Sequence, residues 1–285
     1  MPTLIVNADD FGYTPSINSA IIEAHQKGIV TSTTVMINMP YAEEGLQQVM
    51  RQAPKLGIGL HINLTHGHPI LPPSTIPSLV DENGQFFLPD KLIAAASKFD
   101  GDELYQEIAA QVERLISITG GPPTHLDSHY HMAFIHPLAL EATLALADEY
   151  RLPLRESNLN VSDEELIAGL QFFMPFMPTE FILGLKQQLQ AAYAHSPAPR
   201  YPATFESRYA APNNTLGDLL NILTDTVFTK RPVEIMCHPG RQDDPLITNG
   251  EQKQRELNAL THPATREVIE RLNIELVSFA AFAEN

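Results

Sequence analysis

Apolar and polar positions in the first part of the chain alternate between two periods, one typical of buried strands and one of amphipathic helices. Residues 4–7 (LIVN) form a short apolar run, and residues 30–37 (VTSTTVMI) are rich in β-branched side chains, so we predict strands at both. Between them, Thr14 and Pro15 supply a helix N-cap and a first-turn proline, and Gly28 is typical of a helix end. The pattern therefore predicts a strand–helix–strand unit.

The same alternation of strands and helices continues to the end of the chain. Further strands are predicted at 58–64, 124–127, 153–155, 233–237 and 274–279, and further helices at 41–52, 102–118, 137–150, 215–228, 251–259 and 263–272. Strands that alternate with helices favour a parallel sheet, and about seven such units indicate a distorted or incomplete (β/α) barrel. We therefore expect one α/β domain that spans residues 1–285.

Two segments interrupt this alternation of strands and helices. Residues 65–100 contain several prolines, and residues 156–214 combine irregular stretches with further prolines, as in HSPAPRYPATF. Connections of this length in a compact domain are usually functional or mobile. We interpret both segments as loop insertions and expect them to form walls of a substrate site.

Composition narrows the class of protein. The 285 residues are 44% hydrophobic, which is enough for a substantial core, and the net charge of -16 makes nucleic acid an improbable partner. Cys237 is the single cysteine, so no intrachain disulfide can form, which fits a reducing compartment. The N-terminus lacks a basic signal-peptide region, and no stretch is long and apolar enough to span a membrane. We expect a soluble cytoplasmic protein.

Charged and imidazole side chains follow several predicted strands, where parallel barrels carry their reactive groups. Asp9 and Asp10 directly follow the first strand. The other candidates lie in or just after later strands and are His61, His125, Asp127, His129, His131, Arg155 and His238. These side chains are expected to meet at one rim of the barrel, where they indicate a metal or catalytic centre.

Each of these residues also has a structural interpretation. His61 alone fits a hydrogen-bonded core histidine, and the pair Asp9–Asp10 fits a helix cap followed by a turn. Taken together, one acid and two histidines form a three-ligand metal site with open positions. A divalent ion allows two neighbouring carboxylates to stay ionised, one as ligand and one as base. Non-haem Fe(II) oxygenases and metal-dependent phosphoesterases remain alternative classes for such donors.

Five short motifs occur in a characteristic order: NADDFG, VTSTTVMIN, GLHINLT, PTHLDSHYH and EIMCHPG. In this order they resemble the YdjC-like carbohydrate deacetylases, which include the chito-oligosaccharide (diacetylchitobiose) deacetylases. The resemblance implies a distorted (β/α) barrel, one divalent metal ion and removal of an acetyl group from an N-acetylated oligosaccharide. It also implies a homodimer.

The resemblance assigns the metal ligands. Carried residue by residue, Asp10, His61 and His125 would hold the ion. The family is usually described with Mg²⁺, and Zn²⁺ is reported in related deacetylases. Two imidazoles fit Zn²⁺, Co²⁺, Mn²⁺ or Ni²⁺ better than Mg²⁺, which prefers oxygen ligands.

The resemblance also assigns the groups that would move protons. Asp9 would be the general base, His238 the candidate general acid, and Arg155 a support for Asp9. Amide hydrolysis needs such a pair because water is a poor nucleophile and an unprotonated amine is a poor leaving group. Histidine titrates near neutrality, which suits the donor role.

The segment after the fourth predicted strand supplies candidate sugar contacts. His129, Tyr130 and His131 are expected to bind sugar hydroxyls or to support the ligands, and Asp127 can hold an imidazole in one tautomer. Arg241 departs from the family pattern, in which an aromatic residue often follows HPG, so the sugar specificity stays open. A non-catalytic sugar-binding or regulatory protein, or a single-metal hydrolase of another N-acyl substrate, is the alternative function.

Overall fold

The structure is a computed structural model, and it describes residues 1–156, 162–173, 177–195, 202–206, 208–209, 213–225 and 231–282. Within these ranges, none of the helices combines the length and the apolar character that crossing a membrane requires.

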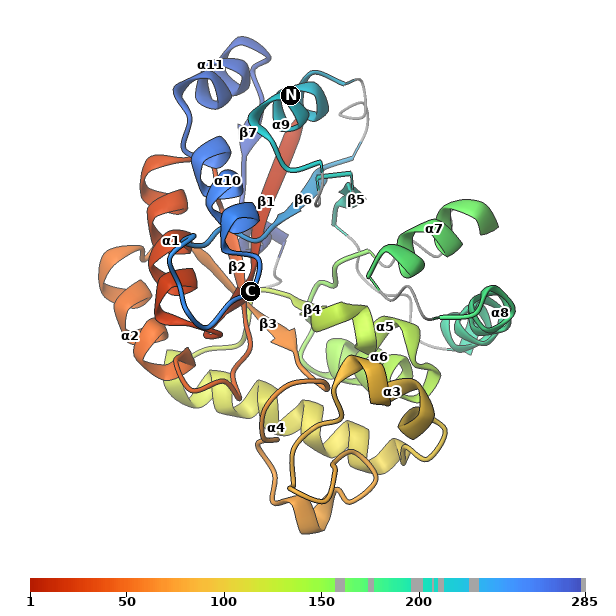
Figure 1. Ribbon diagram of the computed structural model, residues 1–285. Helices are drawn as coiled ribbons and strands as arrows, with labels where there is room; N and C mark the ends of the chain where they lie inside the picture. Colours follow the sequence, from red (N-terminus) through yellow and green to blue (C-terminus); the bar gives the residue numbers. More distant parts are fainter. Residues whose placement is uncertain are drawn as a thin grey trace.

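A curled parallel sheet forms the centre of the molecule (Figure 1). Its strands are β1 (Thr3–Phe11), β2 (Ser32–Val35), β3 (Gly57–Ile62), β4 (Leu126–Ser128), β5 (Thr204–Glu206), β6 (Val233–Cys237) and β7 (Glu275–Leu276). The order is β4-β3-β2-β1-β6-β5, and β7 pairs with the start of β1. All described pairings between these strands are parallel. Because β4 and β5 stand at opposite ends of this order, the sheet is an incomplete barrel, which confirms the predicted fold class.

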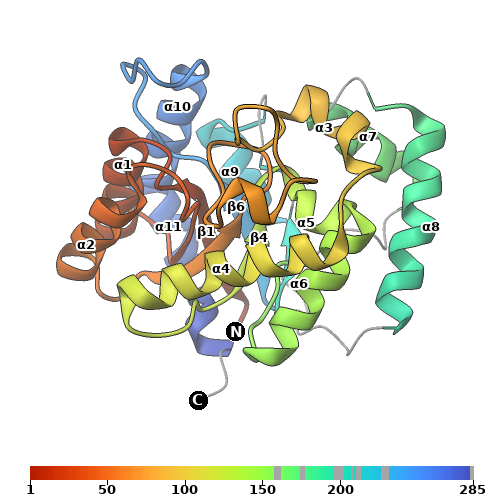
Figure 2. The ribbon, with the colours of Figure 1, turned by 90° about the horizontal axis from the view of Figure 1, so that it is seen from below.

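Helices lie around the sheet. They are α1 (Pro15–Lys27), α2 (Ala42–Gln52), α3 (Pro89–Ala96), α4 (Gly101–Thr119), α5 (Met132–Ile135), α6 (Pro137–Glu149), α7 (Asp163–Phe173), α8 (Thr179–His195), α9 (Leu216–Thr224), α10 (Gly250–Leu260) and α11 (Pro263–Arg271). Both views place α1, α2 and α10 on one side of the molecule and α5, α6 and α8 on the other (Figures 1 and 2). The Thr14 side chain accepts a hydrogen bond from the Ile17 amide, which confirms the predicted N-cap of α1.

The structure differs from the predicted elements at several places, among them the segment 65–100, which contains α3. The strand predicted at 153–155 is reduced to one bridge between Leu126 and Leu154, and the last strand shortens to β7. The segment 156–214 contains α7, α8 and β5 and is not mainly irregular. The prolines of this segment lie outside the described parts of α7 and α8, and acidic residues occupy the first turn of α7, where they stabilise a helix N-terminus.

Candidate active site

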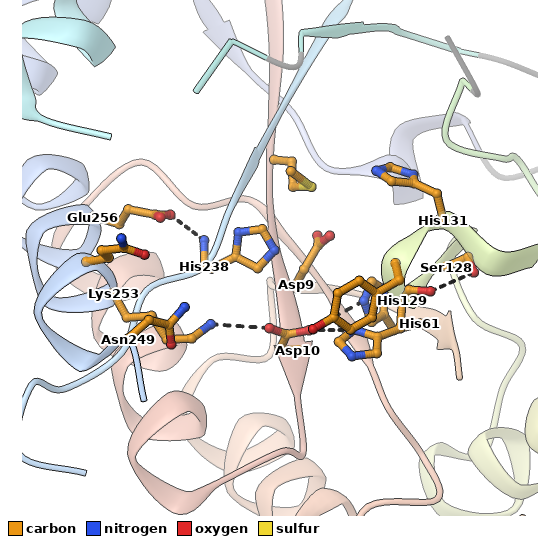
Figure 3. Close-up of a pocket in the computed structure, with 13 residues that line it drawn as sticks. Asp9, Asp10, His61, Ser128, His129, His131, His238, Asn249, Lys253 and Glu256 are labelled. Atoms are coloured by element: carbon orange, nitrogen blue, oxygen red, sulfur yellow. Dashed lines mark hydrogen bonds and ion pairs between the residues drawn. The ribbon is translucent and has the colours of Figure 1, made fainter. Parts of the chain in front are cut away.

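Asp9 and Asp10 lie at the carboxyl end of β1, where the strand contains a bulge. The pairing of β1 with β2 shifts between Ala8 and Phe11, and Asp10 adopts a left-handed backbone conformation with φ of 67°. A bulge re-aims side chains that would otherwise simply alternate between the two faces of the sheet. The two adjacent carboxylates therefore point to different neighbours (Figure 3).

Asp9 is bound on both of its oxygens. The Arg155 guanidinium donates to Oδ1 and Oδ2 in a bidentate pair at 2.7 Å each, and the Asn7 amide donates to Oδ1 at 2.8 Å. Burial alone would raise the pKa of Asp9, but the Arg155 charge and hydrogen bonds hold it well below its ordinary value. Asp9 is therefore a carboxylate at every physiological pH.

Arg155 is a fully buried cation that forms ion pairs with three carboxylates. Besides Asp9, its guanidinium lies 2.9 Å from Asp127 Oδ2 and donates to Glu234 Oε1 at 2.8 Å. The Phe205 ring covers the guanidinium at 5.1 Å. Burial, helped by Asp127 and Asp9 and opposed by Arg155, raises the pKa of Glu234 to about 7. The sequence-based pairing of Arg155 with Asp9 is thus present as a direct contact, within a larger network.

Asp10 has a different environment from Asp9. Its Oδ2 lies 3.2 Å from Lys253 Nζ, while Oδ1 lies 3.1 Å from His129 Nδ1 and 3.6 Å from His61 Nε2. Among the described residues, no donor forms a well-directed hydrogen bond to Oδ1, although that atom is buried. Burial opposes ionisation, yet Lys253 and the two imidazoles hold the pKa of Asp10 well below its ordinary value. Asp10 therefore presents an ionised, unsaturated oxygen to two ring nitrogens.

The orientation of His61 is fixed from behind by Asp127. His61 Nδ1 lies 2.6 Å from Asp127 Oδ1, and Asp127 Oδ2 in turn accepts from Thr34 at 2.9 Å. A proton on Nδ1 leaves Nε2 as the nitrogen that faces Asp10, the arrangement in which carboxylates support metal-binding histidines. Burial lowers the pKa of His61, but Asp127, Asp10 and Asp9 outweigh it and raise that pKa to about 10. An ion bound at Nε2 would displace a proton.

These donors fit a metal ion in number and kind. Ligand atoms of Asp10, His61 and His129 lie within 4.8 Å of one another, and one buried carboxylate oxygen among them has no hydrogen bond in the described part of the chain. One carboxylate and two imidazoles match the ligand preferences of Zn²⁺, Co²⁺, Mn²⁺ or Ni²⁺.

His125 is not brought to this cluster. Its ring is fully buried and stacks on Phe279, with ring centres 3.7 Å apart and an interplanar angle of 9°. A Cβ on Gly59 would come within 2.4 Å of the same ring, so the ring can occupy this position only because residue 59 is a glycine. The imidazole that joins Asp10 and His61 is that of His129, which directly follows the end of β4.

A cavity of about 340 Å³ opens in front of these groups. Its lining residues are Asp9, Asp10, His61, Ser128, His129, Tyr130, His131, Met236, His238, Asn249, Gln252, Lys253 and Glu256. His238 lies across Asp9 from His61 and His129 (Figure 3). The Glu256 carboxylate accepts the backbone N–H of His238, which anchors the segment that carries the imidazole.

Tyr130 and His131 line the cavity, as predicted for sugar contacts, and both have positive φ values, of 51° and 55°. The His66 ring stacks on Tyr130 at 5.8 Å, and the Phe205 ring meets the edge of His131 at 5.9 Å. Burial and the Arg155 charge lower the pKa of His131 to about 3, so its ring is neutral. The two predicted insertions thus contribute supporting rings behind the site, and no lining residue of the described cavity comes from them.

Helix α10 supplies the wall that the sequence interpretation missed. Its contributions are Asn249 at the N-cap, Gln252, Lys253 and Glu256. Their spacing of three, four and seven residues places polar side chains on one helix face. That stripe, on the helix that follows the HPG motif, was the available signal.

The comparisons with known proteins identify the family of the chain. The model of the YdjC-like protein family matches residues 3–271. Carbohydrate deacetylase 2 of Listeria innocua is 33% identical and covers 97% of both chains, and a chitooligosaccharide deacetylase of Yersinia enterocolitica is 31% identical over 97% of this chain and 98% of its own. The chain therefore belongs to the YdjC-like family.

A solved structure extends the agreement to three dimensions. The crystal structure of a protein from Enterococcus faecalis, described as a putative cellobiose-phosphate cleavage protein, is 32% identical. It superposes with a TM-score of 0.78 and covers 99% of each chain. The incomplete barrel is accordingly a fold that this chain shares with that relative.

Proposed function

We propose that this protein is a metal-dependent deacetylase that removes the acetyl group from an N-acetylated sugar, of the chito-oligosaccharide class. The observation that carries the proposal is the buried, unbonded Oδ1 of Asp10, which faces two imidazoles beside the ionised Asp9 in an open cavity. Relatives that match nearly the whole chain and are named carbohydrate or chitooligosaccharide deacetylases support the substrate class.

The proposed ligands are Asp10, His61 and His129, so His129 takes the position that the family resemblance assigned to His125. When bound there, a divalent ion would acidify water and act as a Lewis acid on the acetyl carbonyl. The donor set favours Zn²⁺, Co²⁺, Mn²⁺ or Ni²⁺ over Mg²⁺.

Asp9 is proposed as the general base. It lines the cavity, and one of its oxygens lies within 4.8 Å of a His61 ring nitrogen. Its Oδ2 accepts one hydrogen bond from Arg155, and a carboxylate oxygen can accept two, so a position remains for an attacking water. Arg155 keeps Asp9 ionised and fixes its orientation, which makes it a positioning residue.

His238 is proposed as the general acid that protonates the leaving amine. It occupies the opposite wall from His61 and His129, so a substrate amide between the walls would present its nitrogen to one side and its carbonyl to the other (Figure 3). Tyr130 and His131, with the α10 residues Asn249 and Gln252, are proposed to bind sugar hydroxyls.

The test measures acetate release from a panel of N-acetylated chito-oligosaccharides. Metal-stripped protein would be assayed with single divalent ions added back, next to the Asp9→Asn variant. We expect release that requires a metal ion and disappears in Asp9→Asn. Sugar binding without acetate release would favour the binding-protein alternative, and release from another N-acyl compound alone would change the substrate class.

We further propose that the chain is a single domain over residues 1–285 and forms a homodimer, as the family resemblance implies. Light scattering on the purified protein checks the second point, and a monomer at micromolar concentration would refute it.

A further inference from the structure

Lys253 is a buried lysine whose ammonium group reaches into the proposed metal centre (Figure 3). Its Nζ lies 3.2 Å from Oδ2 of Asp10, and its side chain is 7% exposed. No sequence motif pointed to this residue, and the proposed reaction assigns it no role. A lysine is seldom buried to this extent without a specific partner, and here the partner is a proposed metal ligand.

The chain provides a fitted path for the side chain of Lys253. A Cβ on Gly240 would lie 3.0 Å from Lys253 Cβ and 3.1 Å from its Cδ, closer than packed atoms normally approach. The Gly240 amide also donates to the Lys253 carbonyl at 3.1 Å. The absence of a side chain at Gly240 thus allows the lysine stem to run along the backbone of the HPG segment, which fixes where the ammonium lies.

The ammonium determines which oxygen of Asp10 is free. Lys253 engages Oδ2, and Oδ1 is thereby directed at His61 Nε2 and His129 Nδ1. Without a partner on Oδ2, the carboxyl group could rotate about its broad terminal torsion. We propose that Lys253 is a positioning residue for Asp10, which orients Oδ1 for the metal ion. This inference rests on the proposed metal centre.

Positioning and simple electrostatics predict opposite results when the ammonium is removed. A nearby positive charge repels a divalent cation, so charge alone predicts tighter metal binding without Lys253. Loss of an orienting partner predicts weaker binding, and groups that orient metal ligands typically contribute about 10–100-fold in affinity. The ammonium is already paired with the Asp10 carboxylate, which offsets its repulsion, so orientation is expected to dominate.

The experiment is calorimetric titration of Zn²⁺ and Co²⁺ into metal-stripped protein. Lys253→Met is expected to bind about tenfold more weakly than wild type or worse. Lys253→Arg keeps a cationic donor and is expected to recover most of that loss. Lys55→Met, which removes an exposed lysine, is the matched control and is expected to bind like wild type.

The outcomes separate this inference from the proposed function. Equal or tighter binding by Lys253→Met, while wild type binds one ion, would overturn the positioning role and leave the metal centre intact. Failure of wild type to bind either ion would overturn the metal centre itself. If Lys253→Met does not fold, Lys253→Arg decides: a loss as large as that caused by Asp10→Asn refutes the role, and binding close to wild type supports it.

Discussion

The two carboxylates at the end of β1 are neighbours in sequence, but their surroundings are opposite. Both oxygens of Asp9 are held by protein donors: Arg155 and Asn7 donate three hydrogen bonds to them. Asp10 keeps one buried oxygen that no described residue binds, although two imidazole nitrogens lie within 3.6 Å of it. The Asp9 side is thus oriented by protein donors alone, whereas the Asp10 side leaves an oxygen for the proposed ion.

The difference explains how adjacent acids can be buried together. Arg155 compensates the negative charge of Asp9 on one side, and Lys253 together with the imidazoles compensates the negative charge of Asp10 on the other. Burying an isolated carboxylate is costly, so each acid needs a cation of its own. Because the bulge separates the side chains, the two sets of cations do not compete.

The largest effect is expected on the Asp10 side, from His129→Ala. Loss of a proposed ligand should abolish stoichiometric binding of the ion and reduce acetate release by about 10⁴-fold or more, the combined contribution of Lewis-acid and base chemistry. Calorimetry with Zn²⁺ and an acetate assay measure the two effects.

The matched comparison for this variant is His125→Gln, at the fully buried ring on Phe279. It should retain one bound ion, with a cost mainly in stability. If His125→Gln loses the ion and His129→Ala keeps it, the ligand set implied by the family resemblance is right and the one proposed from the geometry is wrong.

On the Asp9 side, Asp9→Asn should lower kcat by about 10²–10⁴-fold and leave ion binding intact, because the amide cannot accept a proton. Stopped assays of acetate with parallel calorimetry would show this separation. Asp81→Asn, at a half-buried position outside the cavity, should leave both quantities unchanged. A parallel loss of ion binding and kcat in Asp9→Asn would show that the two sides do not act separately.

Removing the shared cation should destabilise the fold. Arg155→Met leaves Asp9, Asp127 and Glu234 without their common partner, and breaking a buried ion pair costs about 3–5 kcal/mol. Denaturant unfolding at pH 7 measures the loss. Arg208→Met removes the ion pairs with Glu206 and Asp225, in which the arginine is 50% exposed, and should cost clearly less, about 1 kcal/mol. Equal costs for both variants would argue against the buried network as a source of stability.

The smallest effect concerns pH. The pKa of Glu234 rises from 4.5 to about 7 on folding, so between these values the folded protein holds a proton that the unfolded chain releases. The folded state binds more protons there, and the contribution of Glu234 to stability therefore falls as pH rises through this window.

Glu234→Gln lacks this titration. Its free energy of unfolding relative to wild type should increase by more than about 1 kcal/mol between pH 5 and pH 7.5, measured by denaturant unfolding at both values. A difference that stays constant or decreases would contradict the raised pKa of Glu234.

Much of the fold was predictable because its signals are local. Thr14, Pro15 and Gly28 define α1 through capping and backbone preferences, and the β-branched run before Ile37 defines β2. Helices α7 and α8 were missed because proline-rich stretches between them obscured their periodicity. Their acidic first turns are weaker signals than a glycine or a proline.

The site residues also divide into those that local sequence signals predict and those that depend on tertiary packing. Strand ends and motif order brought Asp9, Asp10, His61 and His238 to one rim, as the positions on a parallel sheet require. The choice between His125 and His129 depends on where β4 ends, and element boundaries are not encoded sharply in local sequence. The polar stripe of α10 contains Lys253, but that this side chain reaches the site depends on tertiary packing over Gly240, which helical spacing does not report.

The left-handed conformation of Asp10 has a consequence for anyone who wishes to transplant this centre into another barrel. Two identical amino acids have different surroundings here, so their chemical identity does not determine which partners each one binds. A graft of side chains onto a regular strand would give a pair that alternates between the two faces of the sheet. The irregular backbone between Ala8 and Phe11 would have to be copied first, and the directions of the two carboxylates would follow from it.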